Sequence, residues 1–65
     1  MSHEVLVYQN GKVVKRINCK NKKHAKTTWL NESQYFFQYA QLVVNGRPYN
    51  TADAEDYFNR KMKEG

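Results

Sequence analysis

Apolar residues that favour β-structure are concentrated in two segments near the start of the chain, EVLVYQ and KVVKRIN. Short runs rich in such residues and separated by a turn signal are typical of β-strands, so we predict strands over 4–9 and 12–18. Between them stands Asn10-Gly11, a pair that readily adopts the positive φ angles of a two-residue turn. We therefore expect the two strands to form a β-hairpin.

The next segment, KNKKHAKTTWLNES, has apolar residues at helical spacing. This spacing predicts a helix over 22–33, with Asn21 as its N-cap. The run that follows, YFFQYAQLVV, is aromatic and β-branched, which favours a strand over 36–44. The pattern leaves open whether the helix ends near Ser33 or runs on to Phe37.

A second Asn-Gly pair, Asn45-Gly46, precedes a short predicted strand, RPYN, over 47–50. Pro48 cannot donate a backbone hydrogen bond, so this strand belongs at the edge of a sheet. In both halves of the chain the order is strand, Asn-Gly and a base, strand, helix. Either a hairpin-helix unit occurs twice and shares one core, or two hairpins independently need the same turn.

The last segment, TADAEDYFNRKMKEG, predicts a helix over 52–63. Its apolar residues lie four positions apart, and its acids precede its bases, as the helix dipole prefers. The whole order is ββαββα. The predicted fold class is α+β, a mostly antiparallel sheet of three to four strands with two helices on one face. We expect residues 1–65 to form a single compact domain.

Composition is that of a small folded domain. The chain has 65 residues, 40% of them hydrophobic, which suffices for a core but leaves no room for a deep pocket. Cys19 is its one cysteine, so an internal disulfide and cysteine-cluster metal sites are excluded. No apolar run reaches the roughly 18 residues that span a bilayer, and the start lacks the signal-peptide pattern. We expect a cytoplasmic protein without membrane contact.

Positive charge is concentrated in the first half of the chain. Residues 1–31 contain seven lysine and arginine residues against Glu4 alone, whereas residues 32–65 contain four bases against five acids. The net charge is +5. Such asymmetry indicates a surface for an anionic partner.

The basic run KVVKRINCKNKKHAK crosses from the second strand into the first helix. Lysines at a helix start oppose the helix dipole by about 0.3–1 kcal/mol each, which an arriving phosphate would offset. The alternative is a solvated face that keeps the protein soluble. The candidate anion or nucleic-acid contacts are Lys12, Lys15, Arg16, Lys20, Lys22, Lys23, Lys26 and Arg47.

Nine aromatic residues are too many for so small a core to bury completely. We expect Trp29, Phe58 and either Phe36 or Phe37 in the core, between the helices and the sheet. Exposed rings beside lysine or arginine residues would stack on unpaired nucleobases or anchor a protein interface. The candidate surface contacts are Tyr8, Tyr39 and Tyr49.

Catalytic and metal-binding patterns are weak. Cys19 and His24 would pair as nucleophile and base, but no third partner is evident, and a cysteine at a strand end is usually a small apolar residue. His3 adds a third scattered ligand without the spacing of a metal site. We expect no enzyme, no cofactor and no metal.

Two function classes remain. The first is a nucleic-acid-binding module whose basic residues contact phosphates largely independently of sequence. The second is a small inhibitor or adaptor that docks on an acidic surface of a larger protein. It would use the same basic residues together with the tyrosines or the edge of the last strand. The second class rests on a likeness in size to small accessory proteins, phage-encoded ones included. The pattern leaves the oligomeric state open.

Overall fold

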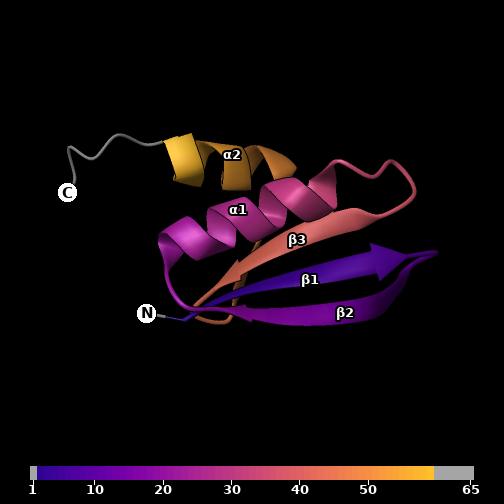
Figure 1. Ribbon diagram of the computed structural model, residues 1–65, viewed down its shortest axis with the longest axis horizontal. Helices are drawn as coiled ribbons and strands as arrows, with labels where there is room; N and C mark the ends of the chain where they lie inside the picture. Colours follow the sequence, from indigo (N-terminus) through magenta and orange to yellow (C-terminus); the bar gives the residue numbers. More distant parts are fainter. Residues whose placement is uncertain (1, 60–65) are drawn as a thin grey trace.

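A computed structural model describes residues 2–59 of the chain as one antiparallel sheet with two helices on one of its faces (Figure 1). The elements in chain order are β1 (His3–Gln9), β2 (Lys12–Cys19), α1 (Lys22–Ser33), β3 (Tyr39–Val44), β4 (Arg47–Tyr49) and α2 (Thr51–Asn59). The strands pair in the order β2-β1-β3-β4. The predicted α+β fold with the order ββαββα is confirmed.

Both Asn-Gly pairs form the expected hairpin turns. Asn10 and Gly11 have φ angles of 54° and 77°, and Asn45 and Gly46 have φ angles of 52° and 81°. Positive φ at both central residues defines the type I′ turn, whose twist matches that of the flanking strands. These two turns join β1 to β2 and β3 to β4, so they set the register within each hairpin.

The register divides the residues of the sheet between two faces. Val5 of β1 pairs with Ile17 of β2 and Leu42 of β3, and these side chains face the helices. Leu6 pairs with Arg16 and Gln41 on the opposite face, because neighbouring residues of a strand point to opposite sides. The sheet therefore has one face covered by helices and one face that the described residues leave open.

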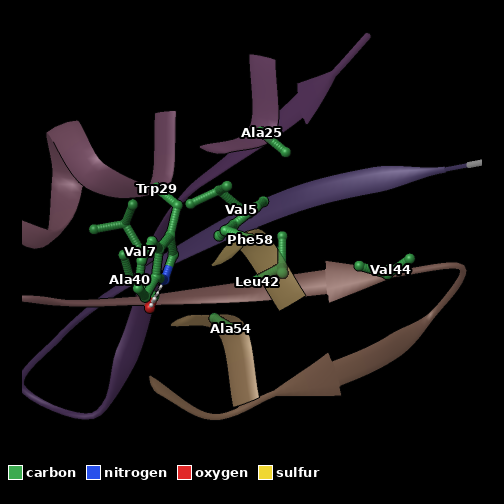
Figure 2. Close-up of a cluster of buried hydrophobic side chains, with 9 residues drawn as sticks. All are labelled: Val5, Val7, Ala25, Trp29, Ala40, Leu42, Val44, Ala54 and Phe58. Atoms are coloured by element: carbon green, nitrogen blue, oxygen red, sulfur yellow. Dashed lines mark hydrogen bonds between the residues drawn. The ribbon is translucent and has the colours of Figure 1, made fainter. Parts of the chain in front are cut away.

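Trp29 and Phe58 lie in the core, as predicted (Figure 2). Their ring centroids are 5.5 Å apart. The indole Nε1–H of Trp29 donates a hydrogen bond of 3.1 Å to the backbone carbonyl of Ala40 in β3. The large ring thus joins α1 to the sheet, and the small residues Ala25 and Ala54 bring the two helices close to it.

The segment between α1 and β3 differs from the prediction. Helix α1 ends at Ser33, and β3 begins at Tyr39 instead of residue 36. Neither Phe36 nor Phe37 is in the core, since their side chains are 98% and 57% exposed. The expectation that one of them is buried was therefore wrong.

The physical reason is the turn that carries the chain from the helix back to the sheet. The Gln38 side chain donates hydrogen bonds to the backbone carbonyl of Glu32, at 2.9 Å, and to its carboxylate Oε1, at 2.8 Å. The backbone N–H of Gln38 donates to the carbonyl of Tyr35. These bonds close the turn with the rings of Phe36 and Phe37 exposed to solvent.

The other boundaries agree closely with the sequence pattern. Strand β4 is an edge strand containing Pro48, as predicted. It ends at Tyr49 because Asn50 caps α2, its side-chain oxygen accepting a hydrogen bond of 2.8 Å from the backbone N–H of Asp53. The part of the predicted second helix over 60–63 lies outside the described residues.

His3 is a buried polar residue at the start of β1, with 3% of its surface exposed. Its Nε2 lies 2.9 Å from the hydroxyl of Tyr57 in a hydrogen bond. Among residues 2–59, no group hydrogen-bonds its other ring nitrogen, Nδ1. Burial lowers the pKa of His3, and the positive charges of the chain's N-terminus and of Lys22 lower it further.

We predict that replacing Trp29 by Phe destabilises the fold by about 1–3 kcal/mol, because the Ala40 carbonyl loses its donor while a ring remains beside Phe58. Urea denaturation followed by circular dichroism measures the loss. The half-exposed Leu30 provides the control, and Leu30→Ala should change the free energy of unfolding by roughly 0.5 kcal/mol or less. Equal midpoints for Trp29→Phe and the parent would contradict this account of the core.

We also predict that acid destabilises the fold through His3. Since its pKa in the folded state lies below the value of about 6.5 in the unfolded chain, the unfolded state takes up the proton first. Stability should therefore fall as the pH drops below about 6.5. In His3→Gln, which keeps a side chain able to hydrogen-bond Tyr57, urea midpoints between pH 7 and pH 5 should depend less on pH. An unchanged dependence in that variant would assign the effect to other groups.

Candidate nucleic-acid interface

The open face is the sheet surface opposite the helices, and its residues lie in rows across the strands. One row pairs Val13, Tyr8 and Tyr39, and the next pairs Arg16, Leu6 and Gln41. A third row contains Asn18, Glu4, Val43 and Pro48. A β-bulge between the first two rows places Val14 opposite no residue of β1. The face is thus apolar and aromatic near the β1–β2 turn and more polar at its other end.

Tyr8 and Tyr39 are direct neighbours on the two central strands. They pair across β1 and β3, and their ring centroids are 6.0 Å apart with an interplanar angle of 40°. The Tyr8 hydroxyl donates a hydrogen bond of 3.2 Å to the side-chain oxygen of Gln41, which fixes its ring. Tyr39 remains 39% exposed. Two of the three tyrosines proposed as contacts therefore lie together on the open face.

An aromatic loop, Tyr35 to Phe37, adjoins these tyrosines. The Phe37 ring packs against Tyr35, with centroids 5.5 Å apart, and against Phe36, with centroids 6.0 Å apart. The loop and the β1–β2 turn lie at the same end of the molecule (Figure 1). Between them is a shallow hollow lined by Tyr8, Tyr39, Phe36 and Phe37, together with Asn10 and Gln38.

Lys15 and Arg16 point to opposite sides of β2. Arg16 pairs with Leu6 on the open face. Lys15 pairs with Val7, on the helix-covered face, and its ammonium forms an ion pair of 3.3 Å with the carboxylate of Glu32 in α1. Arg16 therefore shares the open face with the two tyrosines, whereas Lys15 connects β2 to α1.

Lys12 and Arg47 lie at opposite ends of the sheet. Lys12 pairs with Gln9 beside the first turn, next to the hollow. Arg47 pairs with Val44, which in turn pairs with His3 at the other end of β1. Lys12 and Arg47 are therefore separated by the length of β1.

The lysines at the start of α1 form a separate group near the Arg47 end of the sheet. Its members are Lys20, Lys22, Lys23 and Lys26. Asn21 caps the helix, accepting a hydrogen bond of 2.8 Å from the backbone N–H of His24, and no acid lies in the first turn. The ammonium of Lys22 stands 4.4 Å from the ring centroid of Tyr57 in a cation–π contact. The eight predicted basic contacts thus do not form one continuous surface.

Tyr49 lies apart from the other two candidate tyrosines. It pairs with Leu42 on the helix-covered side and packs against the core, its ring centroid 5.4 Å from that of Tyr57. Its place beneath α2 follows from the alternation of β4, which turns Pro48 to the open face instead. The structure therefore gives Tyr49 a packing role at the position where the sequence predicted a surface contact.

Cys19 and His24 have environments that do not favour nucleophilic chemistry. Burial raises the pKa of the half-buried Cys19 thiol, which lowers the fraction of reactive thiolate at neutral pH. Nδ1 of His24 accepts a hydrogen bond of 3.0 Å from the backbone N–H of Lys20. This ring nitrogen therefore stabilises the turn that leads into α1.

Two further observations concern metals and membranes. Within residues 2–59, no three His, Cys, Asp or Glu side chains gather closely enough to hold a metal ion. Neither α1 nor α2 has the length and apolar character that crossing a membrane requires.

The aromatic loop is the part of the site that the sequence interpretation missed. Its signal was the run Tyr35-Phe36-Phe37 between Gln34 and Gln38, which breaks the alternation of the following strand. Three consecutive rings cannot all face the core from a strand, because alternate residues point outward. At least one exposed phenylalanine therefore follows from the run itself.

Comparison of the chain with protein-family models, with curated proteins and with solved structures gave no match. The candidate interface consequently rests on the geometry of the chain itself. Its central feature is the pair of tyrosines on the open face, continued by the aromatic loop.

Proposed function

We propose that this protein is a small non-enzymatic module that binds single-stranded nucleic acid on the open face of its sheet. The observation that carries the proposal is the pair Tyr8 and Tyr39, side by side on the two central strands with no helix of residues 2–59 above them. Aromatic rings on an uncovered sheet are a common platform for unpaired bases. Each base that stacks on such a ring contributes about 1–3 kcal/mol.

Single strands suit this surface better than duplexes do. The bases of a duplex are stacked on one another, so their faces are closed to a protein ring, whereas an unpaired strand splays its bases outward. The 40° angle between the Tyr8 and Tyr39 rings suits two bases stacked separately better than one flat ring system spanning both. We therefore assign successive bases to the two tyrosines.

Electrostatics supports a path along the half of the open face nearest the β1–β2 turn. Arg16 lies in the row beside the tyrosines and is placed to meet phosphates, whereas Lys12 pairs with Gln9 on the helix-covered side, at the same end of the sheet. Glu4 occupies the row farthest from the tyrosines and would repel a phosphate there. The lysines at the start of α1 would add long-range attraction to a longer strand.

The positive charge of the edge strand β2 has a second physical explanation, against which the proposal must be weighed. Charged residues and bulges on edge strands prevent sheets from pairing with one another, and β2 has both. Protection of the sheet edge accounts for the lysine and arginine residues of β2. It does not account for the rings of Tyr8 and Tyr39 on the open face. For this reason the tyrosines, and not the net charge, carry the proposal.

We predict that the protein binds a 12-nucleotide single strand more tightly than the corresponding duplex, measured by fluorescence anisotropy at low salt. Tyr8→Leu and Tyr39→Leu should each weaken binding roughly 5- to 150-fold, the equivalent of about 1–3 kcal/mol of stacking. Tyr8→Phe and Tyr39→Phe retain the ring and should bind within a few-fold of the parent. Tyr49→Phe, beneath α2, should leave affinity unchanged.

Equal or tighter duplex binding, or unchanged affinity in folded Tyr8→Leu and Tyr39→Leu variants, would contradict the stacking model. No binding by the parent would end the nucleic-acid proposal and favour docking on an acidic protein surface. A pull-down from lysate with and without nuclease separates these cases. A protein partner that persists after nuclease treatment identifies the docking alternative.

We further predict that Arg16→Gln and Lys15→Gln differ in salt dependence, although they remove the same charge from neighbouring positions. Arg16→Gln should reduce the slope of log K against log salt by about 0.7, the value for one phosphate contact on a single strand. Lys15→Gln should leave the slope nearly unchanged and cost at most about 1 kcal/mol of stability, because its half-exposed ammonium pairs with Glu32. Equal slopes for the two variants would show that binding depends on net charge alone.

A further inference from the structure

We infer that the hollow between the β1–β2 turn and the aromatic loop holds one unpaired nucleobase, at the end of a strand that lies on the open face. The inference rests on the proposed function and adds a defined site to it. Four rings line the hollow, from Tyr8 and Tyr39 on the sheet and from Phe36 and Phe37 on the loop. A flat aromatic base entering it meets rings on both the sheet side and the loop side.

Without such an occupant, the exposure of Phe36 has no explanation in residues 2–59. With 98% of its surface exposed, it forgoes the roughly 1.5–3 kcal/mol that burying a phenylalanine would contribute. Its ring and that of Phe37 form an edge-type pair with an interplanar angle of 77°, and the exposure of Phe36 leaves its ring open to a ligand. A stacked base would cover this apolar surface, and no described part of the chain does so.

The loop that carries these rings is fixed at its base. Gln38 donates two hydrogen bonds to Glu32, and its side-chain oxygen accepts a third, of 3.0 Å, from the amide of Gln9 in β1. Helix α1, the loop and the sheet are thereby joined at one residue. The walls of the hollow are consequently held in place before any ligand arrives, which reduces the entropy lost on binding.

The chemistry around the hollow favours a nucleobase over an apolar protein side chain. Asn10, in the turn with a φ angle of 54°, lines the hollow, and its side-chain amide has both a donor and an acceptor. Asparagine amides hydrogen-bond the edges of bases. Lys12 follows the turn directly, at the same end of the sheet as the hollow, and its charge adds attraction for the phosphates of the strand. The hollow is also continuous with the tyrosine pair, because Tyr8 and Tyr39 belong to both.

A fluorescent base analogue tests the inference. In a set of single strands, 2-aminopurine replaces one base at a time, and stacking on a protein ring quenches its emission. We expect one position at or near a strand end to show additional quenching with the parent, which Phe36→Leu and Phe37→Leu abolish. Each of these variants should also bind the strand about 5- to 150-fold more weakly.

A strand that lacks the base at this same position provides the coupling measurement. On that abasic strand, Phe36→Leu should have little further effect, because the phenylalanine and the base act through one contact. The matched control is Leu30→Ala, an exposed apolar change on α1 outside the hollow, which should not alter the quenching. Thermal melts should show that Phe36→Leu stays folded, since its ring is outside the core.

The outcomes distinguish this inference from the proposed function. If Tyr8→Leu weakens strand binding while Phe36→Leu and Phe37→Leu change neither affinity nor quenching, the open face binds the strand and the hollow is not a base site. If the parent binds no strand, both proposals fail together. Equal effects of Phe36→Leu on intact and abasic strands would also overturn the base site, leaving the loop as a contact for a protein.

Discussion

The packing of Trp29 against β3 is the interaction on which the rest of this structure depends. One indole ring, joined to the Ala40 carbonyl by a hydrogen bond and to Phe58 by ring packing, occupies the space between α1 and the sheet. Buried side chains of both helices and of β1 and β3 pack around it. The rings of Phe36 and Phe37, which follow α1, lie outside this core. A domain that buries so little surface cannot place every aromatic residue inside.

The alternation of the strands then decides which side chains share a surface. Arg16 and Lys15 are adjacent in the sequence, yet one lies on the open face and the other pairs with Glu32 beneath a helix. The same rule separates Tyr39, on the open face, from Tyr49, beneath α2. Positive charge counted along the chain therefore overstates the basic surface available to any one partner.

Local signals were sufficient to predict most of the fold. Two Asn-Gly pairs fixed both hairpins, and the spacing of apolar residues predicted both helices, because turn chemistry and periodicity act over a few residues. The outward turn at Phe36 and Phe37 was not predictable in the same way. It depends on the Gln38 side chain, which hydrogen-bonds Glu32 of α1 and Gln9 of β1. The division of the bases into separate groups likewise required the strand order, which pairing preferences alone did not supply.

Two features of the surface oppose stability, and they lie at opposite ends of the sheet. The lysines at the start of α1 oppose the helix dipole with no acid in the first turn, and the bare Phe36 leaves apolar area in water. Lysines also promote solubility, so the first feature has an explanation that needs no ligand. The second has none, because an exposed phenylalanine on a tethered loop contributes neither to folding nor to solubility. The end of the molecule that joins Phe36 and Phe37 to Tyr8 and Tyr39 is therefore the stronger candidate for recognition, with the distant lysines adding attraction that is general to any polyanion.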